Sequence, residues 1–341
     1  MRHGGNYLSV NATRMIGKKS EPKPGLYVQG SDRNQYRSYD EGVTWRKFTT
    51  NRTSNFSSIA MGSNKFAVAS DAAGNGHIRY SEDTGRTWIQ ATTTPVYLSS
   101  VEQNHMKYYP DDNLFLLTGG NTSNASTVTF FYSIGGKTWT GMSPFNSTYV
   151  SGGTYGNGII IADFHGGSST LPLRSTDMGQ SWTPISGSGM PNLDYSVMFS
   201  KPLNMWVAKR RGGSGTGTNI YYSTDNGANW TGIPSTAGLW TSTSGRVFWS
   251  NALSCFIFQE NPTSTVKNRF FTSNDGINWT LRTLSTSITA LYNSFAESEQ
   301  NIFLYNSSTI LTINPDFSSS VMTFSSSVQG VSINGMSYYG G

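Results

Sequence analysis

Four arginines of this 341-residue chain could bind an acidic ligand. A guanidinium group matches a carboxylate with two parallel hydrogen bonds, so arginines that approach one another can hold a carboxylate-bearing molecule. Arg210 and Arg211 follow a strand-like run at 205–208, which is expected to be an inner strand. The alternative interpretation is that these charges are solvated in loops. The four candidates are Arg210, Arg211, Arg246 and Arg269.

Acid–base chemistry on such a ligand would need carboxylates as well. A glycosidase places two acids on either side of the sugar bond that it cleaves. Asp111 and Asp112 follow Pro110 between two strand-like runs, so we interpret them as turn formers. Glu260, Glu297 and Glu299 are the candidate glutamates for a site with the arginines, and solvated loop charges are again the alternative interpretation. No spacing links the remaining aspartates, and the sequence therefore predicts no catalytic residue. These aspartates are Asp32, Asp71, Asp163 and Asp194.

Neither a metal site nor a cofactor site is indicated. The four histidines lie far apart without the spacing of metal ligands. The glycine-rich run at 212–215 is not followed by the lysine of a phosphate-binding loop. Cys255 is the single cysteine and lies in an apolar run, so we expect a buried strand residue without a disulfide. The histidines are His3, His77, His105 and His165.

One short motif recurs along the chain. Its full form is SEDTGRTW at 81–88, and three further copies keep the serine, aspartate, glycine and tryptophan. Two shortened copies, SIGGKTW and SNDGINW, fill the gaps between them. The repeat of about 40–50 residues is that of a propeller blade or a similar array. The copies end at Trp45, Trp88, Trp139, Trp182, Trp230 and Trp279.

The motif has a physical basis as a turn between two strands. The aspartate can accept hydrogen bonds from nearby backbone N–H groups. The glycine supplies a positive φ, and the tryptophan covers the hairpin with a large apolar face. We therefore expect a structural role for the whole set: Asp40, Gly42, Trp45, Asp83, Gly85, Trp88, Trp139, Asp177, Gly179, Trp182, Asp225, Gly227, Trp230, Asp275, Gly276 and Trp279.

This motif resembles the Asp-box, S-x-D-x-G-x-x-W, of the sialidase-like and related β-propeller families. The chain departs from it at Gly135–Gly136, where the aspartate is missing, and at Asp275–Gly276, where the box is one residue short. The resemblance implies an all-β propeller. Sialidases also use three arginines, a tyrosine with a glutamate, and an acid/base aspartate. Their Arg-Ile-Pro tripeptide does not occur here.

Composition limits the classes of function. Charged residues make up 13% of the chain and aromatic residues another 13%, with Gly, Ser, Thr and Asn abundant. This composition is common in extracellular and virion β proteins. No run approaches the roughly 18 apolar residues of a membrane span. The net charge of +5 alone supports no specific nucleic-acid binding. The first 19 residues lack the apolar core of a secretion signal. Release of a phage by lysis would explain an extracellular composition without such a signal.

The predicted organisation is a basic N-terminal arm, residues 1–24, followed by a single propeller, residues 25–341. Strand-like runs predict seven four-stranded antiparallel blades, with six blades as the alternative. The run at 328–338 supplies the strand that the first blade lacks, so the two ends of the chain close the ring. Four long loops should emerge on one face and carry binding: 121–126, 166–170, 212–217 and 262–267.

We therefore predict a non-enzymatic structural, receptor-binding or glycan-binding component of a bacteriophage virion, in its tail, a fibre or a decoration. The expected partners are other virion proteins or a host-surface glycan or receptor, and multicopy or homo-oligomeric assembly is compatible. The expected location is the virion, with secretion as the alternative. Two other functions stay open: a sialidase-like glycoside hydrolase, and a cellular assembly or interaction propeller such as the photosystem assembly factors. The binding residues are not predicted.

Overall fold

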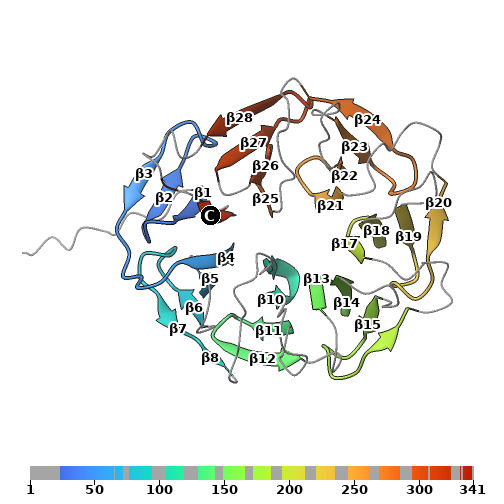
Figure 1. The fold of residues 1–341 in the computed structure, drawn as a ribbon, viewed down its shortest axis with the longest axis horizontal. Coiled ribbons are helices and arrows are strands. Elements are labelled where there is room, and N and C mark those ends of the chain that lie inside the picture. The colour runs from blue at the N-terminus through green and yellow to red at the C-terminus, as the bar shows by residue number, and fades with distance from the viewer. Residues whose placement is uncertain are drawn as a thin grey trace, which may run out of the picture.

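The described strands form antiparallel sheets arranged around a central axis (Figure 1). The computed structural model describes residues 24–64, 66–71, 77–93, 105–118, 130–142, 149–165, 172–185, 194–211, 220–234, 245–260, 269–284, 294–305, 308–323, 331 and 333–339. Residues 1–23 of the predicted N-terminal arm and the four long loops lie outside these residues, as does most of the run at 324–332.

The sheets are numbered here in chain order, and each is given from its innermost to its outermost strand. Sheet 1 contains β29 (Ile333–Tyr339), β1 (Gly25–Gly30), β2 (Gln35–Ser38) and β3 (Arg46–Phe48). Sheet 2 contains β4 (Phe56–Met61), β5 (Ala67–Asp71), β6 (Ile78–Ser81) and β7 (Ile89–Gln90). Sheet 3 contains β9 (His105–Tyr109), β10 (Leu114–Thr118), β11 (Phe130–Ile134), β12 (Thr138–Met142) and β8 (Thr92–Thr93).

The remaining sheets have four strands each. Sheet 4 contains β13 (Tyr149–Gly156), β14 (Ile159–His165), β15 (Leu173–Ser175) and β16 (Thr183–Pro184). Sheet 5 contains β17 (Asp194–Ser200), β18 (Met205–Arg211), β19 (Ile220–Ser223) and β20 (Thr231–Ile233). Sheet 6 contains β21 (Gly245–Ser250), β22 (Cys255–Glu260), β23 (Arg269–Ser273) and β24 (Thr280–Thr283). Sheet 7 contains β25 (Ser294–Glu297), β26 (Ile302–Tyr305), β27 (Thr309–Ile313) and β28 (Ser319–Thr323).

This arrangement is the all-β propeller that the repeat predicts, with four-stranded antiparallel blades. Sheet 3 differs because β8, which leaves sheet 2, pairs in parallel with β12 through Thr92–Thr138 and Thr93–Trp139. No pattern in the sequence predicts this fifth strand. It covers an outer edge whose backbone N–H and C=O groups would otherwise lack partners.

Antiparallel pairing gives the ring two distinct ends. In sheets 2 to 7 the chain turns from the first to the second strand at one end, and the turn from the third to the fourth strand returns to that same end. Because the second of these turns carries the repeated motif in sheets 2 to 6, we call this end the box end. The other end, where each innermost strand begins and each second strand finishes, is called the far end. Hydrogen bonds between innermost strands hold neighbouring sheets level, as from Met106 N to Ser58 Oγ (2.8 Å) and from Thr154 Oγ1 to Val197 O (2.7 Å).

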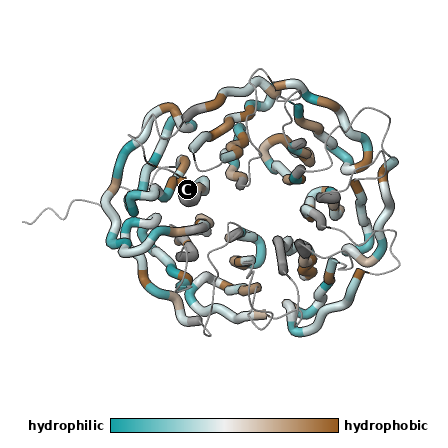
Figure 2. The backbone as a smooth tube through the Cα atoms, viewed as in Figure 1, coloured by the Kyte–Doolittle hydropathy of each residue, from teal (hydrophilic) through white to brown (hydrophobic). Residues whose placement is uncertain are grey.

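Apolar residues are frequent on the strands around the ring (Figure 2), and buried clusters of them lie between neighbouring sheets. Between sheets 5 and 6, for example, Val207 packs with Val247 and Phe256, all of them buried. Between sheets 7 and 1, Phe303 packs with Leu26 and Met336 in the same way. Comparable clusters lie between the other neighbouring pairs. Burial of apolar surface between sheets, rather than within one sheet, therefore stabilises the ring.

The two ends of the described chain meet in sheet 1. β29 pairs antiparallel with β1 from Gly25–Tyr339 to Gly30–Ile333, with a bulge near Gly30. Met61 N in sheet 2 donates to Ser337 Oγ (3.0 Å), and Tyr305 in sheet 7 exchanges hydrogen bonds with the Met336 backbone. The predicted closure by the C-terminal strand is confirmed, because β29 is the innermost strand of the sheet that contains β1.

The boundary between sheets 1 and 2 also holds a buried polar layer. Arg37 and Arg52 are 1% and 8% exposed, and Gln29 and Gln35 lie beside them, fully buried. Arg37 Nε donates to Gln35 Oε1 (2.6 Å), and both side chains donate to the Thr84 carbonyl. The Arg37 guanidinium also lies over the rings of Tyr27 and Phe48. Buried arginines are tolerated here because hydrogen bonds and aromatic faces replace water.

Closure through β29 predicts a strong effect of Met336→Ala. Met336 is 2% exposed within the cluster between sheets 7 and 1. Removing its side chain should lower the free energy of unfolding by about 2–5 kcal/mol through lost burial and the cavity left behind. Urea unfolding followed by tryptophan fluorescence measures this. Val43→Ala, at a 78% exposed position, is the control and should change the value by less than about 0.5 kcal/mol. Equal stability of Met336→Ala and the wild type would contradict a packed closure.

Candidate functional site

The box turns use their aspartates as structural acceptors. Asp83 Oδ1 accepts from Ser81 Oγ (2.8 Å) and from the backbone N–H groups of Arg86 (3.0 Å) and Thr87 (2.9 Å). Ser81 Oγ in turn accepts from Gly85 N (2.7 Å). Gly85 has a φ of 83°, and Trp88 Nε1 donates to its carbonyl (2.9 Å). The serine, aspartate, glycine and tryptophan of the box are therefore linked to one another and to the turn backbone by hydrogen bonds.

The other complete boxes repeat this pattern. Asp40, Asp177 and Asp225 each accept from the serine two residues before and from the backbone four residues after. In the box that is one residue short, Asp275 Oδ1 still accepts from Ser273 Oγ and from two backbone N–H groups. In the copy without an aspartate, Ser133 Oγ donates to the Thr138 carbonyl, and Gly135 and Gly136 both have positive φ.

Hydrogen bonding lowers the pKa of the box carboxylates. Side-chain and backbone hydrogen bonds from Ser181 hold the pKa of Asp177 at about 2. For Asp275, partial burial raises the pKa, but hydrogen bonds from Asn278 and Ile277 outweigh it and bring the pKa to about 2. The pKa of Asp83 is lowered in the same way against the effect of burial. These aspartates are therefore charged at neutral pH, as acceptors of structural hydrogen bonds.

The residue before the box serine connects one sheet to the next box. Arg37 Nη2 donates to the Thr84 carbonyl (3.2 Å), and Arg174 Nε donates to the Asn226 carbonyl (2.7 Å). Thr84 and Asn226 occupy the same position of their boxes, and both have positive φ. The sequence showed an aromatic residue or arginine at this position, but its contact with the following sheet was not predicted.

Charged residues that the boxes do not use gather at the far end of sheets 4, 5 and 6. Asp194, the first residue of β17, pairs in register with Arg211, the last residue of β18. Glu260 ends β22 and pairs with Gly245. The adjacent sheet 4 brings Asp163 and His165 to the same end through β14. The far-end set of sheets 4 to 6 is Asp163, His165, Asp194, Arg210, Arg211, Arg246, Glu260 and Arg269.

The four predicted arginines thus share one end of the ring, on sheets 5 and 6. Arg246 is the second residue of β21 and Arg269 the first residue of β23, and both side chains are half-buried. Asp71 ends β5 and His105 begins β9, so they stand at the far end of sheets 2 and 3.

The predicted glutamates do not all join the arginines. Glu260 stands at the far end, but Glu297 ends β25 at the box end, and Glu299 lies exposed in the turn that follows. Glu297 accepts from Ser250 Oγ (3.0 Å) and Asn251 Nδ2 (2.9 Å) in the first turn of sheet 6. Burial raises its pKa in spite of these hydrogen bonds. Grouping Glu297 or Glu299 with the arginines is therefore wrong, because the antiparallel topology sends them to opposite ends.

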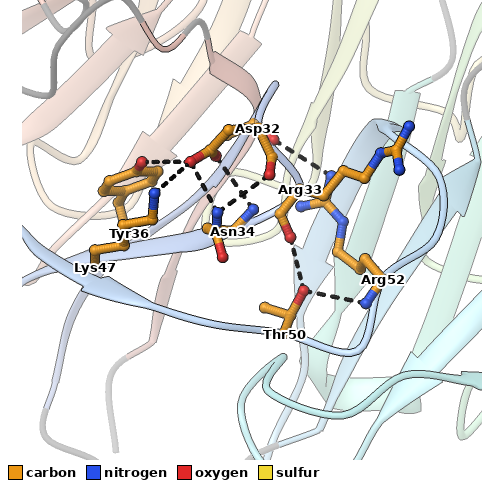
Figure 3. A network of polar contacts seen from close by, with 8 residues as sticks. Asp32, Arg33, Asn34, Tyr36, Lys47, Thr50 and Arg52 are labelled. Atoms are coloured by element: carbon orange, nitrogen blue, oxygen red, sulfur yellow. Dashed lines mark hydrogen bonds and ion pairs between the residues drawn. The ribbon is translucent and has the colours of Figure 1, made fainter.

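Asp32 stands at the far end of sheet 1 within a polar network (Figure 3). It accepts hydrogen bonds from Tyr36 Oη, Lys47 Nζ and Asn34 Nδ2, each at 2.8 Å. Burial alone would raise its pKa, but the hydrogen bonds from Lys47, Asn34 and Tyr36 hold the pKa at about 2. Next to it, Thr50 Oγ1 donates to the Arg33 carbonyl (2.7 Å). This carboxylate fixes the turn from β1 to β2.

Asp111 and Asp112 belong to a 3-10 turn, Pro110–Asp112, at the box end of sheet 3. Tyr155 Oη donates to Asp112 Oδ2 (3.0 Å), and Lys201 Nζ lies 2.8 Å from Asp111 Oδ2. Burial, followed by the charge and hydrogen bond of Asp112, raises the pKa of Tyr155 to about 12. Their interpretation as turn residues agrees with this placement. Cys255 is buried in β22, and burial raises the pKa of its thiol to about 11.

The described part of the chain shows neither a cluster of metal-ligating side chains nor a membrane-spanning helix. In that part of the chain no three His, Cys, Asp or Glu side chains are grouped so as to hold a metal ion. The same part contains no helix of the length and apolar character that crossing a bilayer requires. His3 lies outside the described residues, as do the glycine-rich run at 212–215 and the four long loops.

Comparison with known proteins supports the repeat and the fold. Residues 221–231 match the BNR/Asp-box repeat. No curated protein matches the chain. The GH74 xyloglucanase from Xanthomonas campestris is similar in structure, with a TM-score of 0.61, 14% identity, and coverage of 93% of this chain and 52% of that one. A protein from Lactobacillus plantarum gives a TM-score of 0.59 at 12% identity, covering 93% of this chain and 99% of that one.

YCF48 bound to D1 peptide is also similar, with a TM-score of 0.51, 13% identity, and coverage of 80% of this chain and 84% of that one. At these identities the likeness concerns the fold alone, and the neighbours include a glycoside hydrolase as well as a propeller with a bound peptide. The chain is thus a β-propeller that carries the BNR/Asp-box repeat.

The lowered pKa values predict how stability depends on acid. A carboxylate whose pKa is depressed in the folded state stabilises the fold above its usual value of 3.8. That stabilisation is lost as the pH falls toward about 2. The melting temperature should therefore fall over this range, and Asp275→Asn should show a smaller fall together with a lower melting temperature at pH 7.

Asn274→Ala changes an exposed neighbour in the same turn and should keep the wild-type dependence on pH. Differential scanning calorimetry between pH 7 and pH 2 measures all three proteins. Parallel curves for Asp275→Asn and the wild type would show that this carboxylate does not stabilise the fold.

Proposed function

We propose that this propeller is a non-enzymatic binding protein that holds a receptor or glycan at its far end. The observation that carries the proposal is the placement of guanidinium and carboxylate residues at the far end of three consecutive sheets. Arg210 and Arg211 lie on β18, the second strand of sheet 5. Arg246 lies on β21, the first strand of the neighbouring sheet 6. Arginine forks suit a carboxylate or sulfate on a glycan, or an acidic protein surface.

The packed ring supports a binding role. Hydrogen-bonded sheets with buried clusters between them position the strands on which these residues stand. A backbone that is already ordered before binding lowers the entropic cost of holding a ligand. The acids of the boxes and Asp32 are occupied by structural hydrogen bonds, so they serve the scaffold.

We propose further that the ring has seven blades, one for each sheet, with sheet 1 built from both ends of the chain. The setting that we propose is a bacteriophage virion, where the partners would be other virion proteins or a host-surface receptor. The low charge and the high content of Gly, Ser, Thr and Asn support this setting. The names of the similar proteins given above mention no phage. Co-sedimentation of the chain with particles on a density gradient tests it, and recovery only as free protein would end it.

A glycoside hydrolase is the second candidate. The feature in its favour is that Asp163, Asp194 and Glu260 stand at one end of consecutive sheets, as a pair of acids flanking a sugar bond would require. A hydrolase would release the fluorophore from fluorogenic glycosides and would lose that activity in Asp194→Asn or Glu260→Gln. A binding protein would release none with any glycoside tested.

The binding role predicts that Arg211→Ala combined with Arg246→Ala lowers the affinity for immobilised anionic glycans by at least about ten-fold. This is the effect expected when one or two charge-assisted hydrogen bonds are lost. Surface plasmon resonance measures the affinity. Arg46→Ala, an exposed arginine on the outer strand β3, is the matched control and should bind as the wild type does. Undiminished binding by the double variant would exclude the far-end arginines from the site.

A further inference from the structure

A group of asparagines lies at the box end, away from the far-end site. Asn157 belongs to the first turn of sheet 4, Asn204 to the first turn of sheet 5, and Asn226 to the box of sheet 5. Asn157 Nδ2 donates to Asn226 Oδ1 (2.8 Å) and to Asn204 Oδ1 (3.4 Å). Three amides from two sheets therefore meet at one place on the surface.

Turn lengths expose this place. Asn157 and Gly158 form a two-residue connection between β13 and β14, with φ values of 52° and 76°, as in a tight hairpin. The neighbouring connections are longer, at 110–113 in sheet 3 and 201–204 in sheet 5. A Cβ added to Gly158 would meet nothing within 4 Å. The sheet 4 turn is thus short between two longer ones.

A charged pair spans the two longer turns. Asp111 of sheet 3 and Lys201 of sheet 5 form an ion pair at 2.8 Å although sheet 4 lies between them. Their side chains stay 60% and 69% exposed, so both can still reach a ligand. Leu203, at 36% exposed, adds an apolar surface in the same turn as Lys201. The opposite charges of Asp111 and Lys201 cancel, so this pair adds no net charge to the surface beside the asparagines.

The hydrogen-bonding capacity of the amides is only partly used. Asn157 Nδ2 spends both of its N–H groups on the other two asparagines, so its Oδ1 remains as an acceptor. Asn204 and Asn226 receive those bonds through Oδ1, so their Nδ2 groups remain as donors. One acceptor beside two donors suits hydroxyl groups, which both donate and accept. A phosphate or carboxylate could use only the donors.

We propose that Asn157, Asn204 and Asn226 form a second binding site, for an uncharged sugar residue. The groups come from three separate turns on two sheets, and such a compact cluster suits a sugar ring better than an extended peptide, which needs a line of partners. Asp111 and Lys201 can contact further hydroxyls, and Leu203 can cover a C–H face of the sugar. The site is independent of the far-end arginines, because it lies at the opposite end of the ring.

Replacing Asn204 and Asn226 together by aspartate tests the site. Aspartate keeps the oxygen that accepts from Asn157 and tolerates the positive φ values of 46° and 59°, but it removes both Nδ2 donors. Asn64→Asp combined with Asn113→Asp is the control, because these asparagines also sit in first turns, are exposed, and have φ values of 54° and 47°. Both doubles change the net charge equally.

The probe is a printed array of neutral and anionic oligosaccharides, with affinities of bound neutral glycans measured by calorimetry. The wild type should bind neutral glycans, the Asn204/Asn226 double should bind them about ten-fold or more weakly, and the control should equal the wild type. Melting temperatures check that all variants are folded. Neutral-glycan binding that survives in the Asn204/Asn226 double, or that is lost equally in the control, would overturn this site. A wild type that binds anionic glycans alone would overturn it while leaving the far-end proposal intact.

Discussion

The structure depends on the hydrogen bonds that close each box turn. The serine hydroxyl donates to the aspartate and accepts from the glycine N–H, while the aspartate takes the next backbone N–H groups. These bonds hold the turn in the conformation in which the glycine has a positive φ and the tryptophan donates to the glycine carbonyl. Because Arg37 and Arg174 donate to the box of the following sheet, the same turns also set the spacing between sheets.

Closure of the ring adds a constraint that no single repeat can satisfy. The first sheet lacks an innermost strand until β29 arrives from the other end of the chain. This pairing makes the stability of the ring depend on residues separated by about the whole sequence, and long-range closure of this kind costs chain entropy. The clusters on both sides of sheet 1 offset that cost by burying apolar side chains such as Phe56 and Phe303.

The repeat made the fold predictable because each box residue acts within a few positions of its neighbours. Serine, aspartate and glycine types alone indicate the turn, and the spacing of tryptophans indicates the period. Features that depend on neighbouring sheets were not predictable in this way. The parallel strand β8 and the hydrogen bonds of Glu297 to sheet 6 have no local pattern. The Asn157–Gly158 pair was a readable signal for a tight hairpin, but its contact with Asn226 crosses between sheets.

The candidate sites followed from topology more than from motif. Sequence alone proposed arginines and glutamates without a way to group them. Antiparallel order assigns each to one end, joining Arg211 with Asp194 and separating Glu297 from both. The same order also separates the far-end residues from the turns that hold the ring together. A substitution at the far end leaves the hydrogen bonds at the box end in place, because the two sets of residues lie at opposite ends of the strands.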